Sequence, residues 1–275
     1  MQVSLWQAME LGFHSQREHE RPFREVELRA LVTGPDGDTQ EVPGFWDGGN
    51  RWLIRFPPAA LGEWHYRTIC SDRSDAGLHG REEAFACVPY EGSNPLYRHG
   101  PIGVAAGGTY FAHADGAPFL WLGDTAWNGV LKASDTDWAR YLERRAQQGF
   151  TVVQFVMTQW RSFPADSRGE TAYYGEKDIE INPGFFRRLD ARVKAVNERG
   201  LVAAPVLLWA IAGDRNPGFT LPERDASALA RYMVARYGAY HVVWLLGGDG
   251  DYAGKAAERW RRIGRSVFGA GWRRP

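Results

Sequence analysis

The hydrophobic pattern of the chain changes near residue 119, and this change restricts the folds open to it. Before that point, short runs such as 25–32 alternate polar and apolar residues at period two, which is the pattern of a half-buried strand. Further short runs, separated by turn signals, are found at 52–56, 62–68 and 84–88. Closely spaced short strands of this kind predict a β-sandwich over residues 1–95.

After residue 119, apolar runs alternate with helical patterns. The apolar runs predict four buried strands, at 119–122, 150–157, 201–209 and 242–246. Four helices are predicted between and after them: one capped by Ser134, one capped by Asn182, and two over about 222–237 and 254–268. Four successive strand–helix units predict a parallel sheet covered by helices.

The length of this second part limits how much of a barrel it can form. A (β/α)8 barrel needs about 250 residues, whereas about 157 follow residue 118. The sequence therefore predicts the first half of a TIM barrel, about four βα units, over residues 119–275. Residues 96–118 are interpreted as a linker and a small hairpin. The fold class is thus multidomain, β followed by α/β. Because half a barrel leaves its first and fourth strands with unpaired edges, we expect self-association through the open edge.

Charge and composition exclude several classes of function. Lys plus Arg equals Asp plus Glu, at 33 each, so the chain has no electrostatic footprint for nucleic acid or an anionic membrane. No apolar run approaches the roughly 20 residues that span a bilayer. The first residues lack the pattern of a signal peptide, so the chain as written is expected to be cytoplasmic. Cys70 and Cys87 have no zinc or redox spacing; either they face one another on neighbouring strands or both are free thiols.

Two apolar runs end in an aspartate. The run at 119–122 leads into Asp124 and then Trp127, and the run at 241–248 leads through two glycines into Asp249. Carboxylates bind sugar hydroxyls, and aromatic rings stack on the C–H faces of sugars. Two strands that each deliver an aspartate at the C-terminal end therefore predict a shared rim of a sugar-processing barrel.

Asp249 is the best catalytic candidate. A glycosidase needs one carboxylic acid to protonate the leaving oxygen and one carboxylate to attack or to activate water. The alternative is a turn or N-cap aspartate, because Gly-Gly-Asp-Gly-Asp also suits such a position. Asp251 is interpreted as a solvated turn residue or as the cap of the last helix. No P-loop or dinucleotide motif is present, so phosphate-bearing cofactors have no support.

The remaining candidates are substrate-binding residues with structural alternatives. Asp124 either holds substrate hydroxyls or is a structural carboxylate. Gln154 lies within an apolar strand, where its amide needs a partner, and it either points into the barrel mouth or bonds to Asp124. Trp127, Trp160 and Trp209 are placed near strand ends, so each is either a sugar platform or part of the core.

Taken together, these motifs resemble the apiosidase-like glycoside hydrolases, bacterial (β/α)8 proteins often preceded by an immunoglobulin-like sandwich. The resemblance to the sandwich and the link rests on VPGFWDGG (42–49), WLIRFPP (52–58), GEWHYRT (62–68) and NPLYRHGP (94–101). The resemblance to the barrel rests on DGAPFLWLGDTAW (115–127), YLERRAQQGF (141–150) and VWLLGGD (243–249).

The resemblance implies hydrolysis of glycosidic bonds in plant-type or other complex polysaccharides, without a cofactor or metal. In this family an Asp and a Glu are thought to form the catalytic pair, and the Asp maps onto Asp249 by its place at the strand end. No position matches the Glu, so the chain is expected to be a fragment or a truncated product of such an enzyme. Family members may be exported.

Two alternatives remain open. One is a non-catalytic carbohydrate-binding or structural protein whose working part is the sandwich. The other is a complete four-stranded, doubly wound α/β domain, which would bind a ligand where the strand order reverses.

Overall fold

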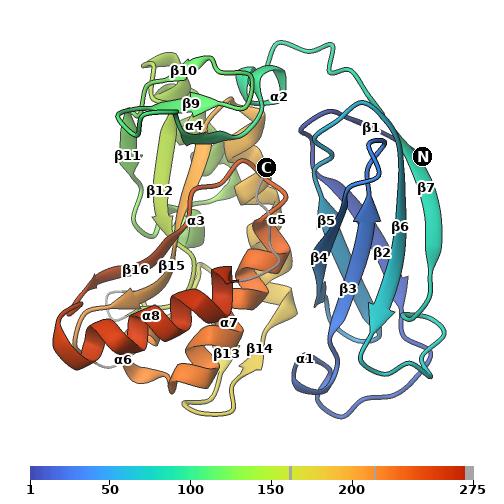
Figure 1. Ribbon diagram of the computed structural model, residues 1–275. Coiled ribbons are helices and arrows are strands. Elements are labelled where there is room, and N and C mark those ends of the chain that lie inside the picture. The colour runs from blue at the N-terminus through green and yellow to red at the C-terminus, as the bar shows by residue number, and fades with distance from the viewer. Residues whose placement is uncertain (161–162, 214, 270–275) are drawn as a thin grey trace.

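The computed structural model describes residues 1–160, 163–213 and 215–269. It consists of two bodies (Figure 1). We call residues 2–88 the β-region and residues 123–268 the α/β-region. A short helix, α2 (Pro95–His99), and a three-stranded hairpin sheet, β8 (Ile102–Val104), β9 (Phe111–His113) and β10 (Pro118–Phe119), connect them. The β9–β10 part of this sheet is the small hairpin expected from the sequence, whereas β8 was not predicted.

The β-region is one hydrogen-bonded sheet that turns back on itself. Its strands are β1 (Gln2–Ser4), β2 (Met9–His14), β3 (Leu28–Thr33), β4 (Thr39–Trp46), β5 (Arg51–Phe56), β6 (Gly62–Cys70) and β7 (Glu82–Val88), in the order β1-β7-β6-β3-β4-β5-β2. β4 pairs with β3 as far as Pro43 and with β5 from Gly44 onward, so this strand carries the turn.

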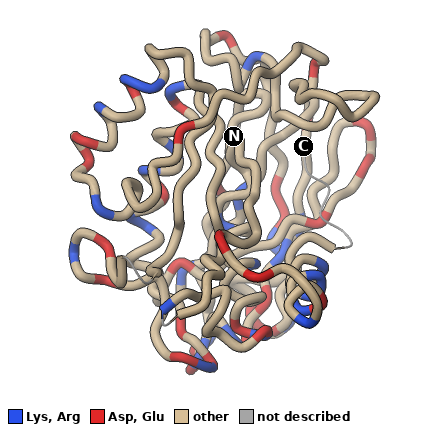
Figure 2. The backbone as a smooth tube through the Cα atoms, turned by 90° about the vertical axis from the view of Figure 1, so that its left-hand side faces the viewer, with Lys and Arg blue, Asp and Glu red and all other residues tan. Residues whose placement is uncertain are grey.

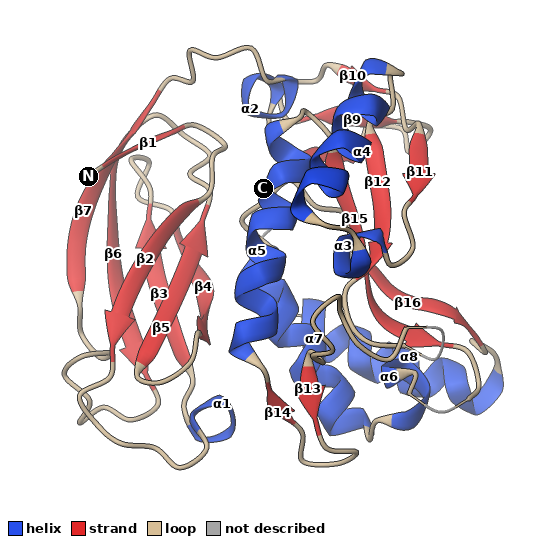
Figure 3. Ribbon diagram, turned by 180° about the vertical axis from the view of Figure 1, so that it is seen from behind, coloured by secondary structure: helices blue, strands red, loops and turns tan. Residues whose placement is uncertain are grey.

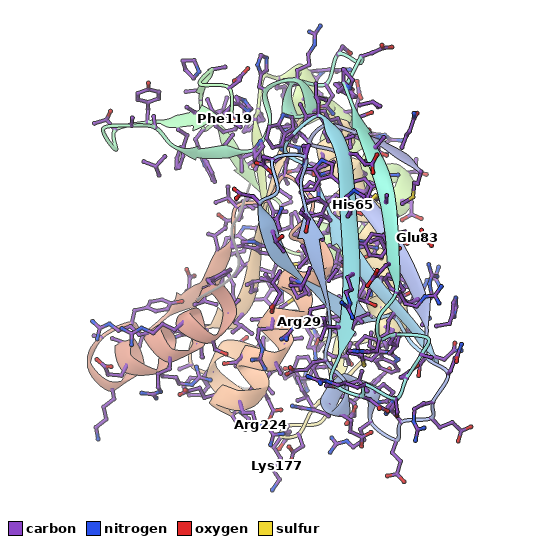
Figure 4. The ribbon with its side chains drawn as sticks, turned by 45° about the vertical axis from the view of Figure 1, so that its right-hand side comes forward. Arg29, His65, Glu83, Phe119, Lys177 and Arg224 are labelled. Atoms are coloured by element: carbon purple, nitrogen blue, oxygen red, sulfur yellow. The ribbon has the colours of Figure 1, made fainter. Side chains whose placement is uncertain are left out.

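Side chains alternate across this folded sheet, as strand geometry requires. Ala30 and Ile54 are fully buried and belong to one apolar core. Arg29, His65 and Glu83 point outward from β3, β6 and β7 (Figure 4). The sequence prediction of a strand over 25–32 was wrong at its start, because α1 (Pro22–Glu25) includes residue 25 and β3 begins only at Leu28.

The α/β-region is a four-stranded parallel sheet in chain order. Its strands are β11 (Gly123–Thr125), β12 (Val152–Val156), β15 (Val202–Ala210) and β16 (Leu245–Gly250), and the main helices that follow them are α4 (Asp135–Gln147), α5 (Pro183–Glu198), α7 (Glu223–Tyr237) and α8 (Gly254–Phe268). Shorter elements complete it: α3 (Gly129–Lys132), β13 (Tyr173–Tyr174), β14 (Glu180–Ile181) and α6 (Pro217–Thr220).

The four main helices cover the same face of this sheet. Val153 and Phe155 of β12 and Ala203 of β15 share one core with α4, α5, α7 and α8. The opposite face carries Val152 and Val202, which pack against Leu96 of α2 instead. Because the strand order has no reversal and the main helices lie on one face (Figure 3), the doubly wound alternative does not describe this sheet.

The run at 119–122 does not form the buried strand that we predicted. The strand of the parallel sheet begins only at Gly123. Leu120, Trp121 and Leu122 lie outside strands and are exposed by 73%, 38% and 41%. An apolar run reads as buried only where neighbouring structure covers it, and β11 is an edge strand with a neighbour on one side alone.

The two cysteines are both free and buried, and they do not face one another. β6 and β7 are neighbours, but Cys87 lies opposite Gly62 and Cys70 lies at the other end of β6. None of the described helices is long and apolar enough to cross a membrane.

Candidate functional site

Three tryptophans converge at the C-terminal ends of the parallel strands. Trp127 follows β11, Trp160 follows β12, and Trp209 lies near the end of β15. The ring centroids of Trp160 and Trp209 are 4.7 Å apart, and that of Trp127 lies 6.0 Å from Trp160 and 5.5 Å from Trp209. We call these three residues the tryptophan cluster. The C-terminal edge of a parallel sheet is where α/β enzymes place their sites.

The members of the cluster differ in exposure. Trp160 and Trp209 are 7% and 4% exposed, whereas Trp127 is 43% exposed. The Trp127 ring stacks on Trp160 at an interplanar angle of 19°, so it forms the solvent-facing layer. Its backbone has a φ of +48°, in the left-handed region that non-glycine residues rarely adopt. Strain of this kind persists where the surrounding structure enforces it, and it is concentrated at functional sites.

The cluster also holds two unused hydrogen-bond donors. The indole N–H groups of Trp160 and Trp209 are buried and have no partner in the part of the chain that the structure describes. An indole N–H can only donate. The site thus combines an aromatic face with polar donors, which is the chemistry that a sugar ring matches.

β16 reaches the cluster through its glycines. A Cβ on Gly248 would overlap the ring of Trp209, and one on Gly247 would overlap the Tyr252 hydroxyl. The tyrosine hydroxyl donates a hydrogen bond to the Gly248 carbonyl. The absence of side chains at 247 and 248 therefore lets these two rings pack against the strand that carries Asp249.

Asp249 is exposed near the end of β16. Its carboxylate makes no hydrogen bond or ion pair with any described residue, so it neither caps a helix nor stabilises a turn. The Asp251 carboxylate, in contrast, accepts a hydrogen bond of 2.9 Å from the Ala253 amide just before α8. The turn role that the sequence assigned to Asp251 is therefore seen in the structure.

Asp124 faces the helices rather than the site. Its carboxylate accepts hydrogen bonds from the Tyr141 hydroxyl, at 2.7 Å, and from the Arg145 guanidinium, both on α4. Burial acts to raise the pKa of Asp124, but these hydrogen bonds and the positive charge of Arg145 outweigh it and hold the pKa below its usual value. This geometry favours the structural alternative, in which Asp124 fastens β11 to α4.

Gln154 does not bond to Asp124. In the register of the sheet Gln154 lies opposite Thr125 and Ala204. It is on the face that carries Val152, which is the face away from the main helices. Asp124 lies opposite Val153 and points to the other face. Asp124 and Gln154 therefore point to opposite faces of the sheet, and the Asp124 carboxylate does not face the same side as Gln154.

One member of the site was missed from the sequence. The Phe163 ring lies 5.6 Å from Trp160, and the two backbones exchange hydrogen bonds of 3.0 and 2.8 Å. The sequence signal for this contact is weak, since it consists of two aromatic residues three positions apart after a buried strand. Among the described residues, no group of three or more His, Cys, Asp or Glu side chains is arranged to hold a metal ion.

Solved structures show the class of fold. A protein from Bacteroides vulgatus ATCC 8482, described provisionally as a glycoside hydrolase, superposes with a TM-score of 0.81 at 24% identity, over 99% of this chain and 54% of that one. A family 5 glycoside hydrolase from the same organism gives a TM-score of 0.54 at 24% identity, over 65% of this chain and 39% of that one. The chain spans about half of these structures' length or less, and the likeness shows a shared fold.

Sequence families identify the chain more closely. The family described as "Apiosidase-like, catalytic domain" matches residues 105–273, and a domain of unknown function, DUF5060, matches residues 2–71. The chain belongs to the apiosidase-like family, as its motifs predicted. No curated protein matches it in sequence.

Proposed function

We propose that this chain acts in the hydrolysis of glycosidic bonds in a complex, plant-type polysaccharide or oligosaccharide, with Asp249 as a catalytic carboxylate. The observation that carries the proposal is the convergence of three tryptophans from three strand ends beside the strand that holds an untied carboxylate. Family membership points to the same chemistry.

The residues divide the work as follows. Trp127 offers its exposed face to a sugar ring, and the donors of Trp160 and Trp209 orient sugar oxygens once the cluster opens to the ligand. Asp249 transfers a proton to or from the reacting atoms, as one of the two carboxyl groups that glycoside hydrolysis requires. Gln154 supplies an amide on the face of the sheet away from the main helices. Asp124 holds β11 in place.

We further propose the finer division of the fold that the sequence indicated. Residues 1–95 form an immunoglobulin-like sandwich, 96–118 a linker, and 119–275 half of a (β/α)8 barrel. Sequential parallel strands with the main helices on one face support the half-barrel. The continuous core inside the folded β-sheet supports the sandwich.

The alternative, sugar binding by the sandwich alone, has less support. Within residues 1–95 the large apolar side chains that are exposed are Met1 and Leu61, and neither is aromatic. A sugar platform needs a flat aromatic face. The exposed aromatic residues, Trp127 among them, all lie beyond residue 104.

Two substitutions test this proposal. Against a panel of plant polysaccharides, with reducing ends as the readout, Asp249→Asn is expected to lose nearly all turnover, whereas its neighbour variant Asp251→Asn retains most of it.

In affinity electrophoresis on the best polysaccharide, Trp127→Ala is expected to weaken binding about tenfold, or about 1.4 kcal/mol. Tyr110→Ala, which removes an exposed ring elsewhere, is expected to leave binding unchanged. Unaltered turnover in Asp249→Asn would reject the assignment of Asp249 as a catalytic residue. If the unsubstituted chain bound polysaccharide but did not hydrolyse it, the result would instead support a carbohydrate-binding protein.

A further inference from the structure

β16 carries one extra residue at the position of Asp249. Its pairing with β15 includes Gly247 and resumes at Gly250, and the register shifts between these two points. One residue of β15, Trp209, is there matched by two residues of β16, Gly248 and Asp249. Such a β-bulge interrupts the ladder and bends the strand, and bulges are over-represented next to active sites, where they re-aim a side chain.

The bulge is built on glycine, the residue that restricts the backbone least. The Tyr252 hydroxyl and the Trp209 ring occupy the space that a Cβ on Gly247 and on Gly248 would take. Close packing therefore requires two glycines directly before Asp249. Because glycine adopts many backbone conformations, the direction of the following carboxylate is poorly defined unless another contact fixes the backbone.

Tyr252 makes such a contact. Its hydroxyl donates a hydrogen bond to the Gly248 carbonyl, which belongs to the peptide bond between Gly248 and Asp249. Because this peptide bond is planar, the direction of its carbonyl also fixes the amide nitrogen of Asp249. Partial burial raises the pKa of Tyr252, and the negative charge of Asp249 raises it further, so the hydroxyl and the carboxylate lie within electrostatic range.

The Tyr252 ring is itself held by α8. Its centroid lies 5.4 Å from that of Trp260, which is buried. The Arg259 guanidinium lies over the Trp260 ring, 5.5 Å from the centroid. The same guanidinium donates hydrogen bonds of 2.7 and 2.8 Å to the carbonyls of Gly218 and Leu221, in and directly after α6. The tyrosine hydroxyl is therefore presented to β16 from a packed support.

We propose that Tyr252 is the positioning residue of Asp249: its hydroxyl fixes the peptide bond before Asp249 and so holds the carboxylate in its reactive direction. This role rests on the function proposed above. The four strands of the parallel sheet carry two charged residues, Asp124 and Asp249, and most other charges of the α/β-region lie on helices and loops (Figure 2). Tyr141 binds the carboxylate of Asp124 directly. Tyr252 instead holds the backbone before Asp249, which leaves that carboxylate free for a substrate.

The first experiment measures turnover. Tyr252→Phe removes the hydroxyl and keeps the ring. On the polysaccharide that the unsubstituted chain hydrolyses best, kcat is expected to fall about tenfold while KM changes less than about twofold, because a displaced catalytic group slows the reaction without weakening binding. Tyr174→Phe is the matched control, since this exposed tyrosine also has a hydrogen-bonded hydroxyl, 2.8 Å from the Asn182 amide, and its kcat is expected to be unchanged. Unchanged kcat in Tyr252→Phe, with Asp249→Asn inactive, overturns the positioning role and leaves the proposed function standing.

The second experiment separates positioning from a general structural role. When Tyr252→Phe is combined with Asp249→Asn, the residual turnover of Asp249→Asn is expected to fall no further, because the hydroxyl acts through a carboxylate that is already absent. A further loss of about tenfold in the double variant would show that the two residues contribute independently. That result overturns the positioning role.

A third experiment does not depend on turnover. Hydrogen–deuterium exchange, measured by mass spectrometry without substrate, follows the amides of residues 245–250. Tyr252→Phe is expected to speed exchange there about fivefold, as the loss of one ordinary hydrogen bond would, and Tyr174→Phe to leave it unchanged. Faster exchange in Tyr252→Phe, combined with no hydrolysis of any glycan by the unsubstituted chain, supports the contact of Tyr252 with the bulge and rejects the proposed function. Unchanged exchange in Tyr252→Phe overturns the positioning role whatever the turnover.

Discussion

At the scale of single residues, the two strand-end aspartates show how one sequence signal leads to two outcomes. Asp124 and Asp249 both follow an apolar run and a glycine. Asp124 falls on the face toward α4 and is bound by Tyr141 and Arg145, whereas Asp249 stays untied. A shift of one residue in register reverses the face of a strand side chain, so the sequence pattern alone could not separate the two.

His241 is a residue for which the structure predicts a pH effect. It is 5% exposed, its Nε2 lies 3.1 Å from the Trp6 carbonyl, and its ring contacts Tyr97. Burial lowers the pKa of His241 to about 4; the Trp6 carbonyl opposes this shift, and His113 adds to it. Because the unfolded chain binds the proton near pH 6.5 and the folded chain does not, acidification favours unfolding, by about 2 kcal/mol between pH 7 and pH 5.

The measurement is urea unfolding at both pH values, with His241→Gln as the comparison. Glutamine can still donate to the Trp6 carbonyl but does not titrate, so its loss of stability between pH 7 and pH 5 should be smaller by about 2 kcal/mol. Equal losses in the two proteins would show that His241 is protonated in the folded state.

At the scale of elements, the four main helices could be predicted and the edge strand could not. The helix expected at 254–268 is α8 with the same bounds, and the Ser134 and Asn182 side chains cap α4 and α5 as their spacing indicated. These signals are local, since a cap bonds to an amide three residues away. The position of β11 depends instead on which chain segments cover its edge, information that lies outside the run at 119–122.

Two glycines with different surroundings give an element-scale prediction. In α8, a Cβ on Gly264 would meet Leu246 at 3.4 Å, an ordinary contact, so Gly264→Ala should stabilise the protein by about 0.5–1 kcal/mol through helix propensity. In β16, Gly248→Ala would force the Trp209 ring to move and should destabilise by about 1–3 kcal/mol. Thermal unfolding measures both. A stable Gly248→Ala protein with unshifted tryptophan fluorescence would contradict the packing described at the cluster.

At the scale of the whole molecule, a buried ion cluster joins the two regions. Asp190 of α5 accepts hydrogen bonds of 2.7 Å from Arg55 of β5 and 2.6 Å from Arg236 of α7. Arg236 is fully buried and also donates to Asp47, at 2.8 Å. These residues are far apart in sequence. Asp47 and Arg55 lie within motifs that carry the family resemblance, but a motif does not show which distant residues it contacts, so the sequence could not reveal the junction.

Removing the central charge of this cluster tests whether the two regions unfold as one. Asp190→Asn leaves two buried guanidinium groups without a full counter-charge, which typically costs about 3–5 kcal/mol. Burial acts to raise the pKa of Asp190, but Arg236 and Arg55 outweigh it and lower the pKa. The stabilisation is therefore present at neutral pH and is lost as the pH falls below about 4. Urea unfolding at pH 7, followed by tryptophan fluorescence, measures the change.

The matched control is Asp135→Asn, which removes the partner of Arg192 in an ion pair whose aspartate is 93% exposed. Exposed pairs contribute about 1 kcal/mol or less, so this variant should unfold close to the unsubstituted protein. If Asp190→Asn behaved like Asp135→Asn, the junction would not hold the regions together. The β-region and the α/β-region would then move independently.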